Sequence, residues 1–131
     1  MSNPTDPVRR FYDALRSGDV ATVLDLLDPQ VQWTEAASFP YYSGTWSGPS
    51  AVVNNLLIPL ARDWEDFSAT AHEFIASDNR VVSLGIYTGK FKKTGRAIKV
   101  PFAHVWRVRN GKLARFDMYT DTAKVLEAVT V

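Results

Sequence analysis

The chain has 131 residues, of which 46% are hydrophobic and 22% are charged; these values fit one globular domain over residues 1–131 and exclude a disordered chain. Its 15 basic and 14 acidic residues give a net charge of +1, too little to attract nucleic acid or an anionic membrane. It contains no cysteine, which excludes disulfides, thiolate catalysis and cysteine-ligated metals.

The sequence shows no signal for secretion or for membrane insertion. The N-terminus is polar where a signal peptide would be apolar, and no run of 18 apolar residues exists. We therefore expect the cytoplasm as the location. The one basic cluster, within residues 90–99, surrounds a predicted turn. A solvated hairpin and a phosphate or nucleic-acid patch both remain open for it, and the balanced charge favours the hairpin.

The first predicted helix begins near Asp6 or Pro7, because Asp6 can cap the free amides and proline suits the first helical position. Gly18 ends it. Apolar residues recur at i, i+3, i+4 and i+7, which forms one stripe for burial. This stripe consists of Val8, Phe11, Tyr12 and Leu15.

Two further helices are predicted. Asp19 caps the second helix, which Asp28-Pro29 stops. Its buried face should contain Val20, Val23, Leu24 and Leu27. Ser50 is the candidate cap of the third, where Pro59 predicts a kink or break. Its buried face should contain Val52, Val53, Leu56, Leu57 and Leu60.

The rest of the chain is mainly predicted strand. A short strand at 31–34 precedes an irregular aromatic segment at 36–48. Four longer strands follow, with a two-residue hairpin signal at Asn110-Gly111, and then a short helix. They cover residues 67–77, 81–91, 96–109 and 112–120, with the helix at 122–128. We expect an α+β fold: a cone-shaped roll with three N-terminal helices on a strongly curved mixed or antiparallel sheet that encloses a pocket.

Alternation along the last two strands predicts which side chains face the helices. The inner set is Ile98, Val100, Phe102, His104, Trp106 and Val108, followed by Ala114, Phe116 and Met118. The outer set is mixed and partly apolar, as a dimer interface would be. Two of its apolar members are Val105 and Tyr119.

Three ionisable residues are candidates for chemistry. His104 is the one such side chain on its apolar strip; it either transfers a proton and orients a carbonyl, or is a core histidine satisfied by a neighbour. Glu35 is either a base at a pocket mouth or an exposed loop residue. Asp121 is either an acid–base group or the cap of the last helix. His72, the second histidine, is expected at the surface, and two isolated histidines predict no metal site.

Segments along nearly the whole chain resemble the nuclear-transport-factor-like superfamily. They are the opening helix and Gly-Asp turn at 8–19, the "G-x-x-G-x-x-x-V" entry to the third helix at 44–52, and the "H-x-x-R-x-x-x-G-K-I … Y-x-D" ending at 102–113 and 119–121. The branch they resemble most is the SnoaL-like proteins, which include polyketide cyclases and relatives of ketosteroid isomerase and limonene-epoxide hydrolase. The resemblance implies a homodimer.

Only some of the functional residues of these relatives have an equivalent in this sequence. The isomerase's general-base aspartate falls near Glu35, and its oxyanion-hole tyrosine falls on Phe11, next to Tyr12. Its second oxyanion-hole acid falls on Ala103, and the hydrolase's acid on Met118, so neither of those reactions is implied. The histidine of several SnoaL-like cyclases matches His104; their acidic partner has no clear equivalent here.

Two functions follow. In the first, a cofactor-independent isomerase or cyclase acts on an apolar carbonyl compound: Glu35 takes a proton while His104 and Tyr12 stabilise the enolate. The carbonyl itself stabilises the carbanion, so no cofactor or metal is expected. In the second, the domain binds an apolar small molecule, or dimerises, without catalysis. The ligand-binding residues would be Phe11, Trp33, Trp46, Phe102, Trp106, Phe116 and Met118.

Overall fold

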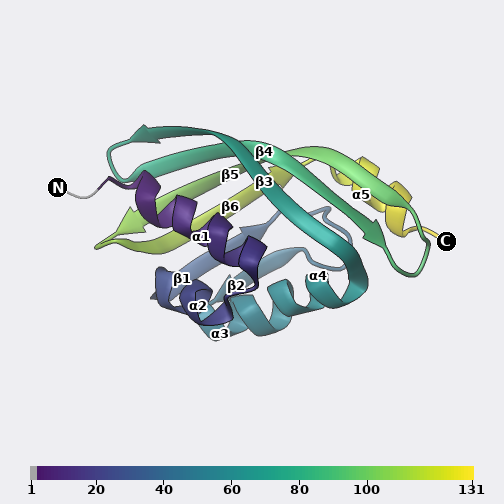
Figure 1. The fold of residues 1–131 in the computed structure, drawn as a ribbon, viewed down its shortest axis with the longest axis horizontal. Helices are drawn as coiled ribbons and strands as arrows, with labels where there is room; N and C mark the ends of the chain where they lie inside the picture. Colours follow the sequence, from purple (N-terminus) through teal and green to yellow (C-terminus); the bar gives the residue numbers. More distant parts are fainter. Residues whose placement is uncertain (1–2) are drawn as a thin grey trace.

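The computed structural model describes residues 3–131 and places the helices mainly before the long strands (Figure 1). No helix in this described part combines the length and the hydropathy needed to cross a membrane. The elements are α1 (Thr5–Ser17), α2 (Val20–Leu26), β1 (Leu27–Glu35), β2 (Gly44–Ser47), α3 (Pro49–Val52), a π-helical turn (Val53–Leu57), α4 (Ile58–Asp63), β3 (Trp64–Ser77), β4 (Arg80–Phe91), β5 (Ala97–Arg109), β6 (Lys112–Thr120) and α5 (Thr122–Val129).

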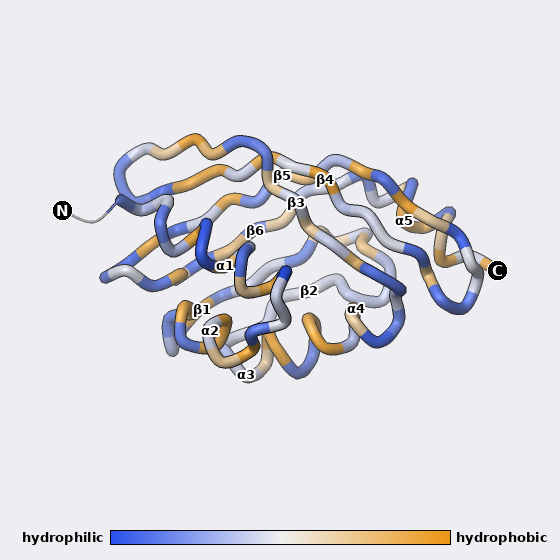
Figure 2. Tube along the Cα trace, in the orientation of Figure 1, coloured by the Kyte–Doolittle hydropathy of each residue, from blue (hydrophilic) through white to orange (hydrophobic). Residues whose placement is uncertain are grey.

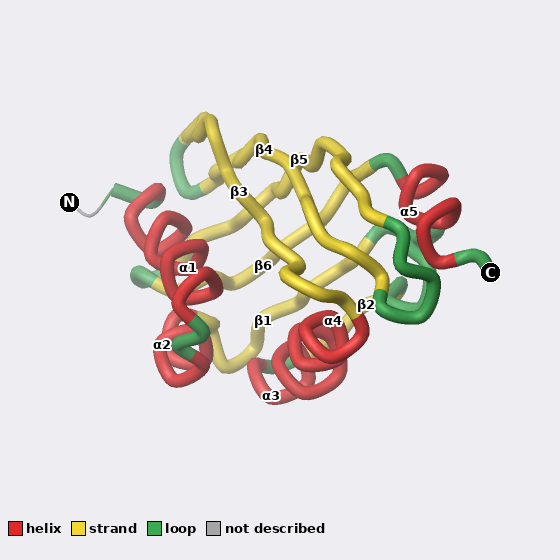
Figure 3. Tube along the Cα trace, turned by 45° about the vertical axis from the view of Figure 1, so that its right-hand side comes forward, coloured by secondary structure: helices red, strands yellow, loops and turns green. Residues whose placement is uncertain are grey.

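One six-stranded sheet organises the fold. Its strand order is β2-β1-β6-β5-β4-β3, and every neighbouring pair is antiparallel except β1 with β6. The sheet is strongly bent, with α1 on its inner side and the α3–α4 segment along its lower edge (Figure 3). It does not close into a barrel, since β2 and β3 remain edge strands. The predicted α+β architecture and mixed sheet are therefore confirmed.

The first helix confirms the predicted stripe but not the predicted cap. Val8, Phe11 and Tyr12 are buried, and Gly18 ends the helix in the left-handed conformation with φ of 71°. The predicted Asp6 cap was wrong: Pro4 occupies the capping position, and the Asn3 side chain accepts the Thr5 amide at 2.9 Å. The helix therefore begins at Thr5, and Asp6 lies inside its first turn.

The second helix has the predicted cap and a different buried face. Asp19 accepts the Thr22 amide at 3.1 Å, as expected. Val20 and Leu24 are exposed, whereas Val23 and Leu26 are buried. The helix stops at Leu26, because the strand β1 already begins at Leu27, so only two turns exist and only one of their faces meets the core.

Pro59 affects the third helical segment through a change of winding. A π-helical turn over Val53–Leu57 separates α3 from α4 just before this proline. Proline has no amide hydrogen for the usual bond to the carbonyl four residues earlier, and its ring crowds that carbonyl. The wider turn accommodates this locally. The predicted break is therefore a π-turn, and Val52, Val53, Leu56 and Leu60 are still buried.

The first two strands, β1 and β2, cover more of the chain than the sequence predicted. The short strand at 31–34 extends to Leu27–Glu35, and β2 pairs with it inside the segment expected to be irregular. Phe39 and Tyr42, from the intervening loop, are buried. Hydrophobic and hydrophilic residues alternate along the central strands (Figure 2).

The inner face of β5 is as predicted: all six residues of the expected set are buried. The neighbouring strand β6 differs at one point. Leu113 is fully buried while Ala114 is half-buried, because the pairing shifts register between Arg107 and Val108 and leaves Ala114 in the bulge. Phe116 and Met118 are buried as expected.

Candidate active site

His104 lies on the inner face of β5 with both ring nitrogens bonded to tyrosines. The Tyr12 hydroxyl is 2.5 Å from Nδ1, and the Tyr87 hydroxyl is 2.6 Å from Nε2. The imidazole is 3% exposed, and burial lowers its pKa well below the usual value, so the ring is neutral. These contacts match the expectation of a core histidine satisfied by hydroxyls. No ring nitrogen is left for a substrate unless one tyrosine moves.

The hydrogen bonds continue from Tyr12 into the sheet. Its hydroxyl is 2.5 Å from Oγ of Ser83, which also accepts the indole N–H of Trp106 at 2.9 Å. The β4–β5 register places Ser83 directly opposite His104. We call this connected set the polar relay; it consists of Trp106, Ser83, Tyr12, His104 and Tyr87. Helix α1 contributes one member, and the adjacent strands β4 and β5 contribute two each.

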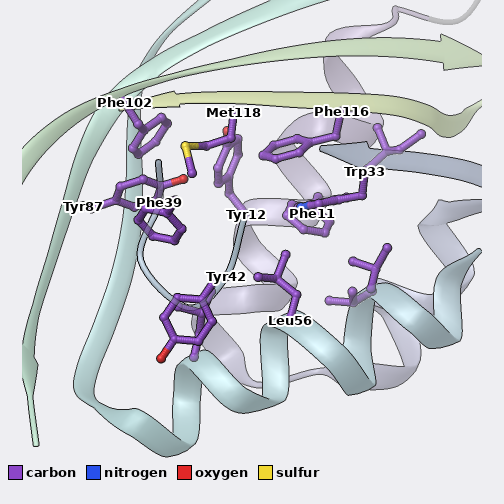
Figure 4. Close-up of a cluster of buried hydrophobic side chains, with 14 of the residues drawn as sticks. Phe11, Tyr12, Trp33, Phe39, Tyr42, Leu56, Tyr87, Phe102, Phe116 and Met118 are labelled. Carbon is purple, nitrogen blue, oxygen red and sulfur yellow. The ribbon is translucent and has the colours of Figure 1, made fainter. Parts of the chain in front are cut away.

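Aromatic rings pack around the polar relay, and Figure 4 shows two of its members, Tyr12 and Tyr87, among them. Phe102 stacks on the imidazole with the ring centroids 3.9 Å apart, and Trp33 stacks on Phe116 at 3.7 Å. Six of the seven predicted ligand-binding residues are buried together here: Phe11, Trp33, Phe102, Trp106, Phe116 and Met118. The seventh, Trp46, is half-buried on β2 opposite Trp33 and packs against the same core.

Glu35 is the last residue of β1 and points into the interior. It continues the inward alternation of Val31 and Trp33, and only 5% of it is exposed. The indole N–H of Trp33 donates to Oε1 at 2.8 Å. Burial raises the pKa of this carboxyl to about 7, an effect that the Trp33 hydrogen bond partly offsets. The expectation of an exposed loop residue is therefore wrong, because β1 continues through position 35 and pairs with β2.

Two members of the polar relay, Ser83 and Tyr87, have no counterpart among the sequence candidates. Both are buried on the inner face of β4. Burial raises the pKa of Tyr87 well above its usual value, and the nearby charge of Glu35 raises it further. Alternation along β4 places Val81, Ser83, Gly85 and Tyr87 on one face. This face is less apolar than the opposite one, so hydropathy gives no reason to predict that it is buried.

The other two catalytic candidates, Tyr12 and Asp121, lie in different parts of the molecule. Tyr12 is central to the polar relay, as described above. Asp121 is exposed and caps α5 by accepting the Lys124 amide at 3.2 Å. The structure thus assigns it the capping role of the two that the sequence left open, and it does not bring this carboxylate to the buried cluster.

Two hollows lie away from the polar relay. One of about 240 Å³ lies between the end of α1, α4 and the start of β3, and is lined by Leu15, Arg16, Leu57, Leu60, Ala61, Phe67, Ser68, Ala69 and Thr70. A wider one of about 670 Å³ lies between β5 and α5. Neither is lined by Glu35 or His104. Phe67, one of the residues that line the smaller hollow, packs its ring on Tyr87 with the centroids 5.3 Å apart.

Comparison with known proteins identifies similar sequences and folds. The model of the SnoaL-like domain family matches residues 8–116. An NTF2-like protein from Burkholderia thailandensis E264 is 30% identical, with 100% of both chains covered and a TM-score of 0.94. An NTF2-like protein of unknown function from Burkholderia pseudomallei K96243 is 32% identical, with 100% of both chains covered and a TM-score of 0.91.

A more distant structure shares the fold alone. Wild-type IdmH, a proposed polyketide cyclase from Streptomyces antibioticus, is 19% identical, with 99% of this chain and 100% of that chain covered and a TM-score of 0.80. A comparison with curated proteins gave no match.

Proposed function

This chain belongs to the family of SnoaL-like domains, and within it we propose a cofactor-independent isomerase or cyclase that moves a proton on a small apolar carbonyl compound. The observation that carries the proposal is the buried carboxyl of Glu35, held by the Trp33 indole, with a pKa raised to about 7. A base with a pKa near 7 accepts a proton readily, and about half of it is ionised at neutral pH. The shared fold of IdmH, a proposed polyketide cyclase, is consistent with such chemistry.

The proposed reaction has two steps, the removal of a proton and its return. The Glu35 carboxylate takes a proton from the carbon next to the carbonyl; the C–H electron pair forms a C=C bond, and the carbonyl electrons move to oxygen. In an isomerase the substrate carries a C=C bond β,γ to the carbonyl, so the protonated Glu35 returns the proton to the γ-carbon of the dienolate, the C=C bond moves into conjugation and the carbonyl re-forms. In a cyclase the enolate carbon instead attacks a second carbonyl of the substrate, a C–C bond forms as that C=O π bond breaks, and Glu35 gives the proton to the resulting alkoxide. Hydrogen bonds from the buried polar groups stabilise the intermediate oxyanion, and they are strong there because the surrounding rings exclude water.

Access to this buried site runs from the smaller hollow. Its mainly apolar lining suits a hydrophobic substrate, and Phe67, one of the lining residues, packs on the Tyr87 ring. Phe67 is half-buried, so its ring can turn with less repacking than a core residue would need. The proposal therefore includes an apolar substrate that displaces Phe67 on entry.

The test is hydrogen exchange on a simple ketone. 2-Tetralone is incubated with the protein in D₂O, and the loss of its α-hydrogen signals is followed by proton NMR. The wild type should accelerate exchange over buffer, and Glu35→Gln should lower the rate at least about 100-fold. Glu65→Gln, at an exposed carboxylate on β3, is the matched control and should leave the rate unchanged. Wild-type rates in Glu35→Gln would contradict the proposal.

A binding module without catalysis is the second candidate, and a specific observation favours it. Both nitrogens of His104 are satisfied within the protein, and neither hollow reaches Glu35. This function predicts that 2-naphthol binds by burial against aromatic rings. Its affinity, followed by the fluorescence of the naphthol, would then be unchanged in Glu35→Gln and sharply reduced in Trp106→Ala. Trp106→Phe keeps a ring and loses only the N–H, so it separates packing from the hydrogen bond to Ser83.

A further inference from the structure

Strand β5 extends beyond the end of its neighbour β6. The β5–β6 pairing begins at Phe102, opposite Thr120, whereas β4 pairs with β5 as far as Ala97. Residues 97–101 therefore have a neighbouring strand on one side only, although β5 is an inner strand of the sheet. We call this segment the free edge of β5. Unpaired main-chain groups along a strand can pair with another chain.

Two hydrogen bonds show which main-chain groups of the free edge are unpaired. The Arg96 carbonyl accepts an amide of β4 at 2.9 Å and so faces β4, whereas the Pro101 carbonyl accepts a β6 hydroxyl at 2.7 Å and so faces the other way. Main-chain groups alternate in direction along a strand, so the N–H and C=O of Ala97 and Lys99 also face away from β4. Within residues 3–131, neither β6 nor α5 forms a backbone hydrogen bond to these two residues.

The wider hollow, of about 670 Å³, lies between this edge and α5. Helix α5 follows β6 directly and is held at its other end by the β4–β5 hairpin (Figure 1). There Arg96 donates to the carbonyls of Glu127 and Thr130, and the Thr94 hydroxyl donates to that of Ala128. The hollow is thus framed by a strand edge and a helix, and its volume lies within the roughly 300–1,000 Å³ of ligand sites.

The residues around this hollow combine apolar side chains with an excess of positive charge. Three cationic side chains and one carboxylate line it, which gives a net charge of +2. Lys99, on the free edge itself, is exposed and forms no ion pair within residues 3–131. The charged residues are Arg96, Lys99, Lys124 and Glu127, and the buried apolar ones include Ile98 and Val100.

We infer that the free edge of β5 binds an extended acidic segment of a partner protein, which adds a strand between β5 and α5. An extended peptide supplies both the acceptor and the donor that the N–H and C=O of Ala97 and Lys99 lack. Its carboxylates would lie on the Lys99 side, and its alternate apolar side chains against Ile98 and Val100. A second copy pairing through the same edge is disfavoured, because like charges would meet. The inference goes beyond the proposed reaction and does not involve Glu35.

The first test measures amide exchange in D₂O on the free ¹⁵N-labelled protein by NMR. The amides of Ala97 and Lys99 should exchange at least about 100-fold faster than those of Ile98 and Val100, which face β4. Equal protection of all four amides would show that the edge is already paired and would overturn the inference.

The second test adds a capped pentapeptide of alternating glutamate and valine at millimolar concentration. We expect amide shift changes at residues 97–101 and at least about tenfold slower exchange of the Ala97 and Lys99 amides. The matching peptide of lysine and valine should cause neither effect. An acidic peptide that leaves the free edge unchanged, or that shifts only other regions, overturns the inference.

Two variants separate main-chain pairing from charge. Lys99→Gln keeps the N–H and should weaken acidic-peptide binding about threefold. Lys99→Pro also removes the N–H and should weaken it at least about tenfold. Proline fits this position because Pro101 already occupies the same edge, and the unfolding midpoint by circular dichroism checks that the chain is folded. Lys93→Gln, at an exposed turn residue, is the matched control and should bind within about twofold of the wild type.

Two outcomes would replace the peptide with a different ligand. Equal affinities in Lys99→Pro and Lys99→Gln would show that only charge contributes, which overturns strand addition. Glutarate, a dicarboxylate without a peptide backbone, should not slow exchange of the Ala97 and Lys99 amides. If it protects them as well as the acidic peptide does, the hollow is a site for a small acid and the inference is wrong.

Discussion

A half-buried strand usually has its more apolar side chains on the inner face, but in β4 the outer face is the more apolar one. Its inner face carries Ser83, Gly85 and Tyr87, whereas its outer face carries the more apolar Val82, Leu84 and Ile86, all half-buried. The same contrast continues onto β5, where the buried His104 lies opposite Ser83. Polar groups are stable inside because each one is hydrogen-bonded, and apolar groups are tolerated outside because their exposure has a modest free-energy cost.

Space is a second difference between the faces. The inner face must hold the ring of Phe102, which stacks on His104 and lies over Gly85 of the adjacent strand. On the outer face, Leu84 carries a full side chain and stays half-buried. The inner face of β4 therefore depends on shape and on hydrogen-bond partners, and the outer face on β-sheet propensity. Substitutions in the buried core and on the outer face of the sheet should therefore differ in their effects.

Gly85→Ala should be the most damaging small change. A Cβ at position 85 would lie 2.1 Å from the carbonyl oxygen of Thr70 and 2.6 Å from Cζ of Phe102, distances that force backbone and ring to move. We expect a loss of at least about 3 kcal/mol in the free energy of unfolding, measured in urea. The adjacent outer-face change Leu84→Ala should cost only about 1 kcal/mol, although it removes more atoms. A larger loss in Leu84→Ala would reverse the comparison of the two faces.

Glu35→Gln should stabilise the protein at alkaline pH. The pKa of Glu35 rises from 4.5 to about 7 on folding, so the folded state binds the extra proton between these values and its stability falls as the pH rises through them. The difference corresponds to roughly 3 kcal/mol above pH 8. The amide introduced by this substitution still accepts the Trp33 N–H without a buried charge. We expect denaturation curves of the variant and the wild type to coincide near pH 4.5 and to separate above pH 7; parallel pH profiles would contradict a buried carboxyl.

Ser83→Ala should have an intermediate effect. It removes the acceptor of the Trp106 indole and a hydrogen-bond partner of the Tyr12 hydroxyl, and both groups are buried. We expect a loss of about 1–2 kcal/mol in the free energy of unfolding. Thr88→Ala, at an exposed hydroxyl on the outer face of the same strand, should change it by less than about 0.5 kcal/mol. Equal effects at both positions would show that the polar relay adds nothing to stability.

Val105→Thr on the outer face of β5 should have the smallest effect on the fold, within about 0.5 kcal/mol, because the side chain is half-buried. The outer face is also where the sequence predicts a homodimer. Sedimentation velocity of the wild type at micromolar concentration tests that prediction, and Val105→Arg should then sediment as a monomer. A wild-type monomer at all concentrations would contradict the homodimer.

The elements whose sequence signals are local could be predicted from the amino-acid sequence. The stripe in α1, the caps at Gly18 and Asp19, the Asn110-Gly111 hairpin and the alternation along β5 were all predicted correctly, since turn residues and hydrophobic periodicity act over a few positions. The order of the elements also predicted the α+β roll. His104 and most of the aromatic cluster followed from the same alternation.

The partners of His104 and the burial of Glu35 depend on contacts between segments that are far apart in the chain. Hydropathy favours the wrong face of β4, so Ser83 and Tyr87 enter the site only through the β4–β5 register, which positions Ser83 against the imidazole. Glu35 is buried because β1 pairs with β6 in parallel and with β2 beyond the predicted strand end. Such pairings join segments far apart in the chain and are selected by packing of the whole core, which no short window of sequence contains.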